Sequence, residues 1–253
     1  MKLFVQTHGD GFPLVILHGL FGSSDNWQTL AKRFAGHFRV YAIDQRNHGR
    51  SPHSEIQSYA VMSGDLLEFF RDHGLSEAFV VGHSMGGKTA MQFALDHPTM
   101  VRKLVVVDIA PKEYSARHDH ILEALTGLDL SQYHSRSEIE NSLAPKIASS
   151  ATRQFLMKNL HRTDQGFVWK INLDAIYSSY DEMNRAIAGP PFSNPVLFIH
   201  SLTSGYLDQK DLPAIRALFP AGRFVGLNVG HWIHAEAPDD FHRIVLDFLQ
   251  HDS

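Results

Sequence analysis

Residues 82–89 read GHSMGGKT, and this stretch could carry out two different kinds of chemistry. Its first five residues fit G-x-S-x-G, in which a serine on a tight turn between a strand and a helix acts as a nucleophile. The whole stretch also fits G-x-x-x-x-G-K-[ST], a loop whose backbone N–H groups surround nucleotide phosphates. Both patterns need a strand before them and a helix after them. EAFVVGHS and MGGKTAMQFALDHP satisfy both requirements, so the local sequence leaves the choice open.

The rest of the chain favours the nucleophilic serine. A phosphate-binding loop normally follows an early strand of its domain, whereas at least two strand–helix units precede residue 82. The acidic partner that such a loop would need, Asp108 at the end of LVVVD, comes only one helix later. A serine hydrolase instead requires a histidine on a loop after the last strand, and NVGHW places His231 there. The chain order Ser, Asp, His is the one expected for this type of serine turn.

The pattern assigns a role to each of several residues. Ser84 is the predicted nucleophile, although a serine there could simply cap the following helix. His231 is the predicted general base and then general acid. The oxyanion needs backbone N–H donors, and we expect Leu20, in the early loop HGLFG, and Met85, directly after the serine, to provide them. Phe21 is the alternative to Leu20 because the loop geometry cannot be read from sequence.

Two further groups of residues have both a structural and a functional interpretation. The pattern D-x-R-x-x-G-x-S predicts a turn in which an aspartate and an arginine pair near the loop; its residues are Asp44, Arg46, Gly49 and Ser51, with His48 beside them. Lys88 is expected to be a solvated helix residue, with binding of an anionic substrate group as the alternative. His234 is expected to be structural, and no carboxylate set at matching spacing accompanies the histidines, so no metal site is predicted.

Short runs rich in Val and Ile alternate with helical patterns, which predicts a parallel sheet covered on both faces. The predicted strands include PLVILHG, FRVYAID, EAFVVGHS and KLVVVDIA. The rhythm stops at residues 112–192, where helix-like stretches occur around 118–127, 135–148, 150–160 and 174–187 without a strong buried strand. We therefore expect an α/β core made of residues 1–111 and 193–253, interrupted by a helical cap at 112–192.

Composition restricts the class of protein. The 253 residues carry a formal net charge of −4, which argues against nucleic acid as a partner. No apolar run is long enough to span a membrane, and the N-terminal residues lack the pattern of a signal peptide. The chain has no cysteine, which excludes disulfides and a thiolate nucleophile and is compatible with a cytoplasmic location. We expect a monomer or small homo-oligomer that needs no cofactor.

Five motifs in order resemble the α/β-hydrolase superfamily: HGLFGS, DQRNHGRS, GHSMGGK, VVVDIAP and GHWIHAEAP. Within it, the chain is similar to the small bacterial YbfF-type esterases and their eukaryotic relatives. The resemblance covers nearly the whole chain and is weakest in the insert. It implies an α/β-hydrolase fold with an eight-stranded, mostly parallel core sheet flanked by helices, and a helical cap inserted into it.

The resemblance also raises a question about the catalytic acid. In many relatives an aspartate follows the strand that resumes after the cap, but the corresponding position here is Ser204, within LFIHSLTSGYL. Asp208 lies four residues further on and is one alternative. Asp108 is the preferred candidate because it ends a core strand, where sites gather in open α/β sheets. YbfF-type esterases use the aspartate at this position, so the resemblance supports the same choice.

The sequence thus predicts a serine esterase or thioesterase that hydrolyses small, short-chain acyl esters or acyl-CoA thioesters through an acyl-enzyme on Ser84. A serine at this turn argues against dehalogenases and epoxide hydrolases, which use aspartate. Three alternatives stay open: a carbon–carbon bond hydrolase or lyase of the same fold, a catalytically silent binding protein, and a nucleotide-binding protein. Fold alone does not decide the chemistry.

Overall fold

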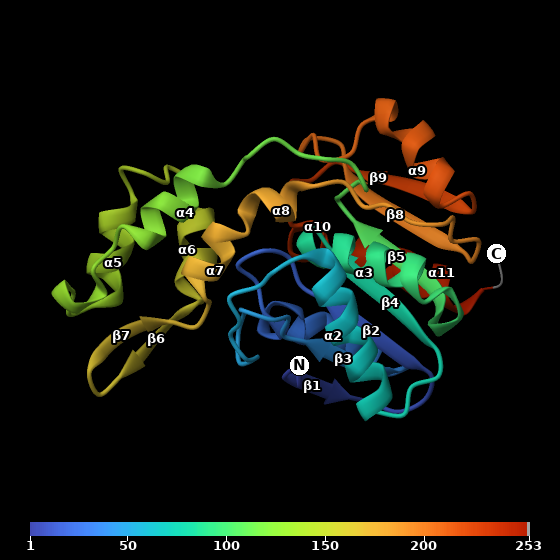
Figure 1. The fold of residues 1–253 in the computed structure, drawn as a ribbon, viewed down its shortest axis with the longest axis horizontal. Helices are drawn as coiled ribbons and strands as arrows, with labels where there is room; N and C mark the ends of the chain where they lie inside the picture. Colours follow the sequence, from blue (N-terminus) through green and yellow to red (C-terminus); the bar gives the residue numbers. More distant parts are fainter. Residues whose placement is uncertain (252–253) are drawn as a thin grey trace.

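The computed structural model describes residues 1–251 and is built around one seven-stranded sheet (Figure 1). The strand order is β1-β3-β2-β4-β5-β8-β9. The strands are β1 (Val5–His8), β2 (Pro13–Leu17), β3 (Arg39–Ile43), β4 (Ala78–His83), β5 (Val101–Val107), β8 (Val196–Ser201) and β9 (Gly222–Leu227). All neighbours are parallel except β1 and β3. The predicted mostly parallel sheet is confirmed.

The expected eight-stranded core is wrong for the described part of the chain. Residues 1–12 form one strand, β1, which pairs directly with β3 in antiparallel fashion. No strand follows β9 in the residues up to 251, where the chain forms two helices instead. The sheet therefore has seven strands.

Successive strand residues point to opposite faces, so each core strand contributes to two hydrophobic clusters. On one face Leu17, Val80 and Val106 pack under α2 (Tyr59–Asp72), α3 (Met85–Asp96) and α9 (Leu212–Leu218). On the other face Ile16, Val81 and Val107 pack under α1 (Gln28–Phe34) and α11 (Pro238–Gln250). This double cover explains why the strands read as continuous apolar runs.

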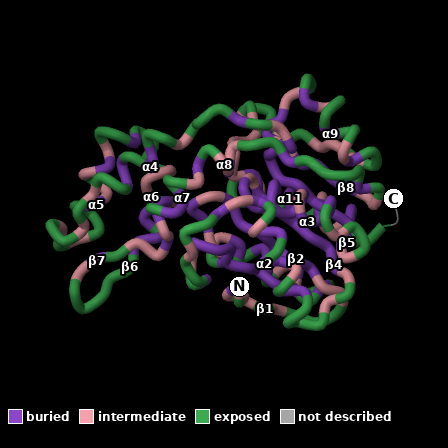
Figure 2. Tube along the Cα trace, in the orientation of Figure 1, coloured by how far each residue is buried: buried purple, intermediate pink, exposed green. Residues whose placement is uncertain are grey.

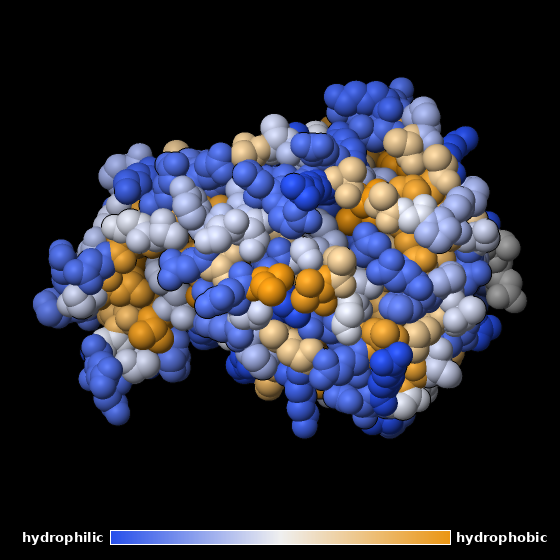
Figure 3. Space-filling view, in the orientation of Figure 1, coloured by the Kyte–Doolittle hydropathy of each residue, from blue (hydrophilic) through white to orange (hydrophobic). Residues whose placement is uncertain are grey.

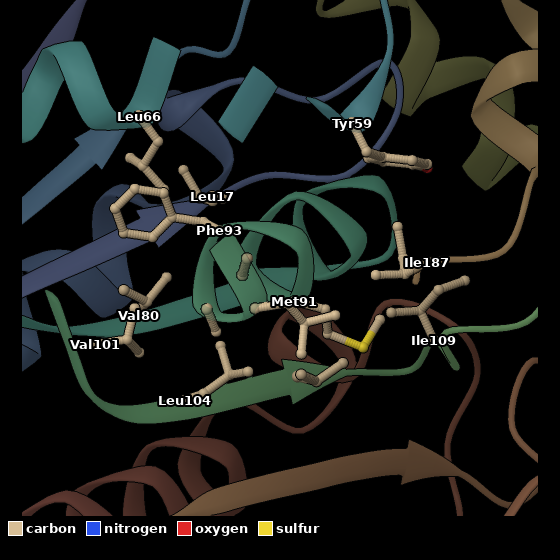
Figure 4. Packing of buried hydrophobic residues seen from close by; sticks show 14 of the residues in the cluster. Leu17, Tyr59, Leu66, Val80, Met91, Phe93, Val101, Leu104, Ile109 and Ile187 are labelled. Carbon is tan, nitrogen blue, oxygen red and sulfur yellow. The ribbon is translucent and has the colours of Figure 1, made fainter. Parts of the chain in front are cut away.

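Helix α3 is the most deeply enclosed of these helices. All of its residues from Met85 to Met91 and from Phe93 to Leu95 are buried, and the burial map shows it running through the interior of the molecule (Figure 2). Phe93 lies between Leu66 of α2 and Val80 of β4 (Figure 4). A helix enclosed on all sides cannot shift relative to the sheet without opening the core. Its N-terminus is therefore a rigid support for Ser84.

The segment between β5 and β8 extends to one side of the sheet (Figure 1). It contains α4 (Asp119–Thr126), α5 (Arg136–Leu143), α6 (Ser150–Met157), α7 (Leu173–Ser178) and α8 (Tyr180–Asn184). It has its own apolar cluster, which includes Leu122, Ile139, Leu143 and Ile176. Helix α5 is shorter than the predicted 135–148 because Pro145 follows Ala144, and a residue before proline is disfavoured in a helix.

Two features of this segment differ from the sequence analysis. The predicted helix at 174–187 is two short helices separated at Ser179. In addition, β6 (Leu160–Thr163) and β7 (Gly166–Trp169) form an antiparallel hairpin that was not predicted. Gly166, with φ 121°, makes its tight turn possible. The hairpin is largely exposed, so it lacks the apolar run by which buried strands are recognised.

The remaining short elements connect the larger ones. They are the 3-10 helices η1 (Ser24–Trp27), η2 (Pro98–Met100), η3 (Leu130–Gln132) and η4 (Gln209–Asp211), together with α10 (Ile233–Glu236). The face of the molecule in Figure 3 is mainly hydrophilic, with separate small apolar patches. None of the helices formed by residues 1–251 has the length and apolar character needed to cross a bilayer.

Candidate active site

Ser84 stands on a strained turn between β4 and α3. Its φ is 52° and its ψ is −117°, a conformation that residues with a side chain rarely adopt. Two glycines make the turn possible: a Cβ on Gly82 would lie 2.2 Å from the Gly86 oxygen, and one on Gly86 would lie 2.5 Å from the Leu17 oxygen. The Ser84 N–H donates to the Val107 oxygen at 3.0 Å, which ties the turn to the neighbouring strand β5.

Asp108 follows β5 in a second strained conformation, with φ 49°. Its N–H continues the ladder to β8 by donating to the Ile199 oxygen at 2.8 Å. The carboxylate is fully buried and both of its oxygens are used. Oδ1 accepts from the Ser201 N–H at 2.8 Å, and Oδ2 lies 2.7 Å from Nδ1 of His231. Since β4 and β5 are adjacent, the turns that carry Ser84 and Asp108 lie side by side.

His231 lies on the loop between β9 and α10, and several groups fix its orientation. The bond to Asp108 assigns the proton to Nδ1 and leaves the lone pair on Nε2. His83 lies with Nε2 3.0 Å from the His231 oxygen. The Tyr206 ring stacks on the His231 ring with centroids 4.1 Å apart. Glu236 accepts from the N–H of Gly230 at 2.7 Å and from that of Trp232 at 3.3 Å.

The loop HGLFG passes directly beside Ser84. A Cβ on Gly19 would lie 3.2 Å from the Ser84 Cβ, so glycine permits this approach. The Phe21 N–H faces His48 Nε2 at 3.3 Å and is therefore engaged there. Asn159 of the insert donates to the Phe21 oxygen at 2.7 Å. With Phe21 held on both sides, Leu20 is the better candidate for an oxyanion donor.

Two buried histidines support this loop in their neutral form. His18 Nδ1 bonds to the Gly19 oxygen at 2.8 Å, and its Nε2 accepts from the Gln45 N–H at 2.9 Å. His48 Nδ1 bonds to the Arg46 oxygen at 2.8 Å. Burial lowers the pKa of His48 to about 3 and lowers the pKa of His18 as well. Both rings therefore stay uncharged near neutral pH, and each donates a hydrogen bond through one ring nitrogen and accepts one through the other.

Two cavities meet at Ser84. The larger, of about 210 Å³, contains His231, Gly19 and Phe21 in its wall, together with Phe155 and Leu156 from the insert. The smaller, of about 50 Å³, is formed by Met85, Lys88, Ile109, Tyr114 and other side chains, including Tyr59 and Tyr180. Leu20, Ser84, His118 and Tyr206 border both. A group attached to Ser84 thus has space in two directions.

Known proteins share this architecture. The model of the α/β hydrolase fold family matches residues 13–124. The sn-1-specific diacylglycerol lipase ABHD11 of Danio rerio is 37% identical over 96% of this chain and 80% of its own length. Esterase YbfF of Escherichia coli is 31% identical over 96% of this chain and 95% of its own length. A solved structure of a marine microorganism esterase is 42% identical, covers 98% of this chain and 99% of its own, and has a TM-score of 0.95.

The chain belongs to the α/β-hydrolase family. The resemblance derived from its five motifs is thereby confirmed, as is the fold class. More distant solved structures, including an enol-lactonase from Burkholderia xenovorans at 17% identity and a TM-score of 0.76, share the fold alone.

In this α/β hydrolase, the position at which many relatives carry the catalytic acid is occupied by Ser204, which lies in a turn. Ser204 donates its N–H to Ser201 Oγ at 2.9 Å and its Oγ accepts from the Tyr206 N–H at 3.2 Å. Asp208 precedes the short helix η4 as its N-cap and pairs with Lys210 at 3.2 Å. Of the two candidate aspartates, the structure brings Asp108 to the histidine and leaves Asp208 at the surface.

Two expectations about charged residues are wrong. Lys88 is buried rather than solvated, because α3 is enclosed on all sides and its side chain runs beneath the insert. Asp44 and Arg46 do not pair with each other. Arg46 binds Asp65 through two hydrogen bonds of 2.6 and 2.8 Å, whereas Asp44 accepts from the backbone of Ser24 and Arg50.

Sequence reasoning missed residues that hold the site without reacting. Ser201 links Asp108 to the loop before His231, since its hydroxyl donates to the Val229 oxygen. Tyr206 lies within LFIHSLTSGYL, where the sequence pattern concerns only the position of the acid. Glu236 lies within GHWIHAEAP, a motif whose pattern assigns no role to this residue. The sequence shows only that these residues lie inside or near the motifs. That position does not indicate which residue of the site each of them contacts.

Proposed function

We propose that this protein is a serine hydrolase of carboxylic esters. The observation that carries the proposal is the strained Ser84 turn beside His231 and its buried partner Asp108, with Ser84 and His231 in the wall of one cavity. The printed names of the relatives support the same substrate class, since an esterase and a diacylglycerol lipase both act on esters.

Ser84 Oγ attacks the carbonyl carbon while its proton passes to Nε2 of His231. The oxyanion that forms accepts hydrogen bonds from the N–H groups of Leu20 and Met85. The intermediate collapses, the bond to the leaving group breaks, and His231 returns the proton to the departing oxygen. Water then attacks the acyl-enzyme by the same route and releases the acid. Asp108 keeps His231 in the Nδ1–H tautomer and stabilises the imidazolium.

The positions of the two cavities support one arrangement of the two halves of the substrate. The leaving group must receive its proton from His231, and His231 borders the larger cavity alone. The acyl group therefore occupies the smaller cavity, which has room for about four water-sized groups at 10–15 Å³ each. This supports short acyl chains. An alcohol or a thiol can leave by the same mechanism, so thioesters such as acyl-CoA remain within the proposal.

A fluorophosphonate probe tests the proposal because it bonds covalently to an activated serine. The wild-type protein should label and should hydrolyse p-nitrophenyl acetate, whereas Ser84→Ala should do neither. Loss of the nucleophile in a serine protease reduces turnover by about a millionfold. Ser115→Ala is the matched control, because this hydroxyl also borders the smaller cavity and its loss should leave labelling intact. Labelling of folded Ser84→Ala would refute the assignment.

A further inference from the structure

Lys88 lies one helical turn after the proposed nucleophile. Its N–H donates to the Ser84 oxygen at 3.0 Å, and residues four apart on a helix share a face. The side chain is 1% exposed. Its Nζ donates to the Asn184 oxygen at 3.1 Å and to the Arg185 oxygen at 2.5 Å. The buried amine thus bridges the core helix and the segment in which the insert returns to the core.

The amine forms no direct ion pair among the described residues, although the charge of Glu113 acts on it from a longer distance. No ion pair formed within residues 1–251 includes Lys88. The rings of Tyr59 and Tyr114 lie 5.3 and 5.0 Å from Nζ, measured to their centroids. Their hydroxyls are bound elsewhere, to the oxygens of Met183 and Tyr206. Burial lowers the pKa of Lys88 to about 7, while the negative charge of Glu113 acts in the opposite direction.

An ammonium group has three N–H donors, and two backbone carbonyls use two of them. Lys88 also borders the smaller cavity, together with Ser84. A buried charge is costly unless it is paired, so an anion in this cavity would favour the protonated amine and would gain its remaining donor and a positive charge that no direct ion pair compensates. Most of the cavity wall is otherwise apolar or aromatic, from Met85, Ile109 and Met183 among others.

We propose that Lys88 binds a carboxylate carried by the acyl half of the substrate, which makes half-esters of short dicarboxylic acids the preferred substrates. This inference rests on the proposed function, because it takes the acyl group on Ser84 to lie in the smaller cavity. The volume of about 50 Å³ limits the chain between the two carbonyl carbons to about one or two methylene groups. Binding pairs the Lys88 charge without moving the backbone carbonyls that hold it.

Arg117 is the competing cation at this cavity. Its guanidinium lies over the Tyr206 ring, 4.6 Å from the centroid, and donates to the Gly205 oxygen at 3.2 Å. Arg117 is exposed, so solvent and salt screen its charge. Lys88 is buried and faces the same space. A carboxylate held within the cavity therefore gains more from Lys88, and variants of the two residues separate the alternatives.

The experiment compares two substrates that differ in charge but hardly in shape. Monomethyl succinate carries the carboxylate, and methyl succinamate replaces it with a neutral amide. We expect kcat/KM of the wild-type protein to favour the succinate by about tenfold to hundredfold, the range of a charge-assisted hydrogen bond. Lys88→Met should reduce this ratio to about one or below. Methanol release measures both reactions at pH 7 and low ionic strength.

Lys103→Met is the matched control. Lys103 is also a buried lysine whose Nζ donates to backbone oxygens, those of Phe248 and His251, but it lies on β5 away from both cavities. It should retain the wild-type ratio even if its stability falls. If Lys88→Met does not fold, Arg117→Met decides the matter: a wild-type preference that this variant retains supports Lys88, and one that it loses refutes the inference.

Several outcomes would overturn the inference. A wild-type ratio near one, with p-nitrophenyl acetate hydrolysed normally, would refute it and leave the proposed function intact. A ratio that survives Lys88→Met but is lost in Arg117→Met would move the site to Arg117. A Lys88-dependent preference for acetoxyacetate over acetoxyacetamide would place the carboxylate on the leaving group. Failure to hydrolyse any ester or to label with the probe would refute the proposed function itself.

Discussion

The core and the insert contribute to the site in different ways. In the core, Ser84 and Asp108 occupy strained backbone positions at the ends of adjacent strands, where φ is 52° and 49°. In the insert, no helix exceeds eight residues within the described chain, and its contacts with the site include the side chains of Asn159 and Tyr180. The burial map shows the same contrast: the core strands are enclosed, while much of the insert is exposed (Figure 2).

This difference separates two functions within one chain. Strain of about 1–3 kcal/mol per residue persists only where surrounding structure enforces it, and the close-packed sheet does so. The insert has a smaller apolar cluster and can vary its side chains without disturbing that sheet. We infer that the core determines the reaction and that the insert determines which groups reach it. The following predictions, from largest to smallest effect, test this division.

Asp108→Asn should reduce turnover of an ester substrate by about ten thousandfold, the loss seen when the corresponding aspartate of a serine protease is replaced. The amide cannot stabilise the imidazolium or select the working tautomer. Asp208→Asn is the control and should change turnover little, since its carboxylate pairs with Lys210 at the surface. Both values come from kcat measured on folded protein. A larger loss in the Asp208 variant would show that the acid lies elsewhere.

Acyl-chain length should affect turnover by more than about tenfold. The smaller cavity of about 50 Å³ accepts a butyryl group, whereas a palmitoyl group would have to displace its walls at a cost of about 1–3 kcal/mol. Comparison of kcat/KM for p-nitrophenyl butyrate and p-nitrophenyl palmitate measures the effect. Faster hydrolysis of the palmitate would mean that the insert opens, or that the acyl group lies in the larger cavity.

Asn159→Ala should lower kcat/KM several-fold, and the loss should not exceed about tenfold. The side-chain amide of Asn159 donates a hydrogen bond from the insert to the Phe21 oxygen. Leu20 directly precedes Phe21 in the loop that carries the oxyanion donor. Loss of this hydrogen bond should also cost about 1–3 kcal/mol of unfolding free energy, because a buried carbonyl loses its partner. Asn194→Ala is matched, since that amide donates to the Val101 oxygen in the core. It should lower stability alone, and an equal loss of activity would refute the link.

Nucleotides should not bind to the protein, although GHSMGGKT fits the pattern of a phosphate-binding loop. The Lys88 ammonium is held by two backbone oxygens below the insert, and the glycine backbones pack against Leu17 and His18. No space remains for the loop to surround a triphosphate. Calorimetric titration with ATP and magnesium should show no heat of binding. Micromolar binding would contradict the serine-hydrolase assignment.

Local patterns were sufficient to predict much of the core from the sequence. Apolar runs bounded by glycine and proline predicted β2, β3, β4 and β5, because strands covered on both faces leave a continuous apolar signal. The exposed β6–β7 hairpin leaves no such signal and was missed. The position of Ser84 could be predicted because its turn requires glycines at a fixed spacing. Both glycines lie within the five consecutive residues 82–86.

The chain by itself therefore determined the parallel sheet, the position of the insert and the turn that carries Ser84, since each depends on residues near one another in sequence. Tertiary structure decided the rest. It pairs Asp108 with His231 across 123 positions, buries Lys88 beneath residues 184 and 185, and divides the space around Ser84 into two cavities. These contacts depend on how β5, β9 and the insert are placed in space. No local pattern encodes that placement, because it results from the packing of the whole molecule.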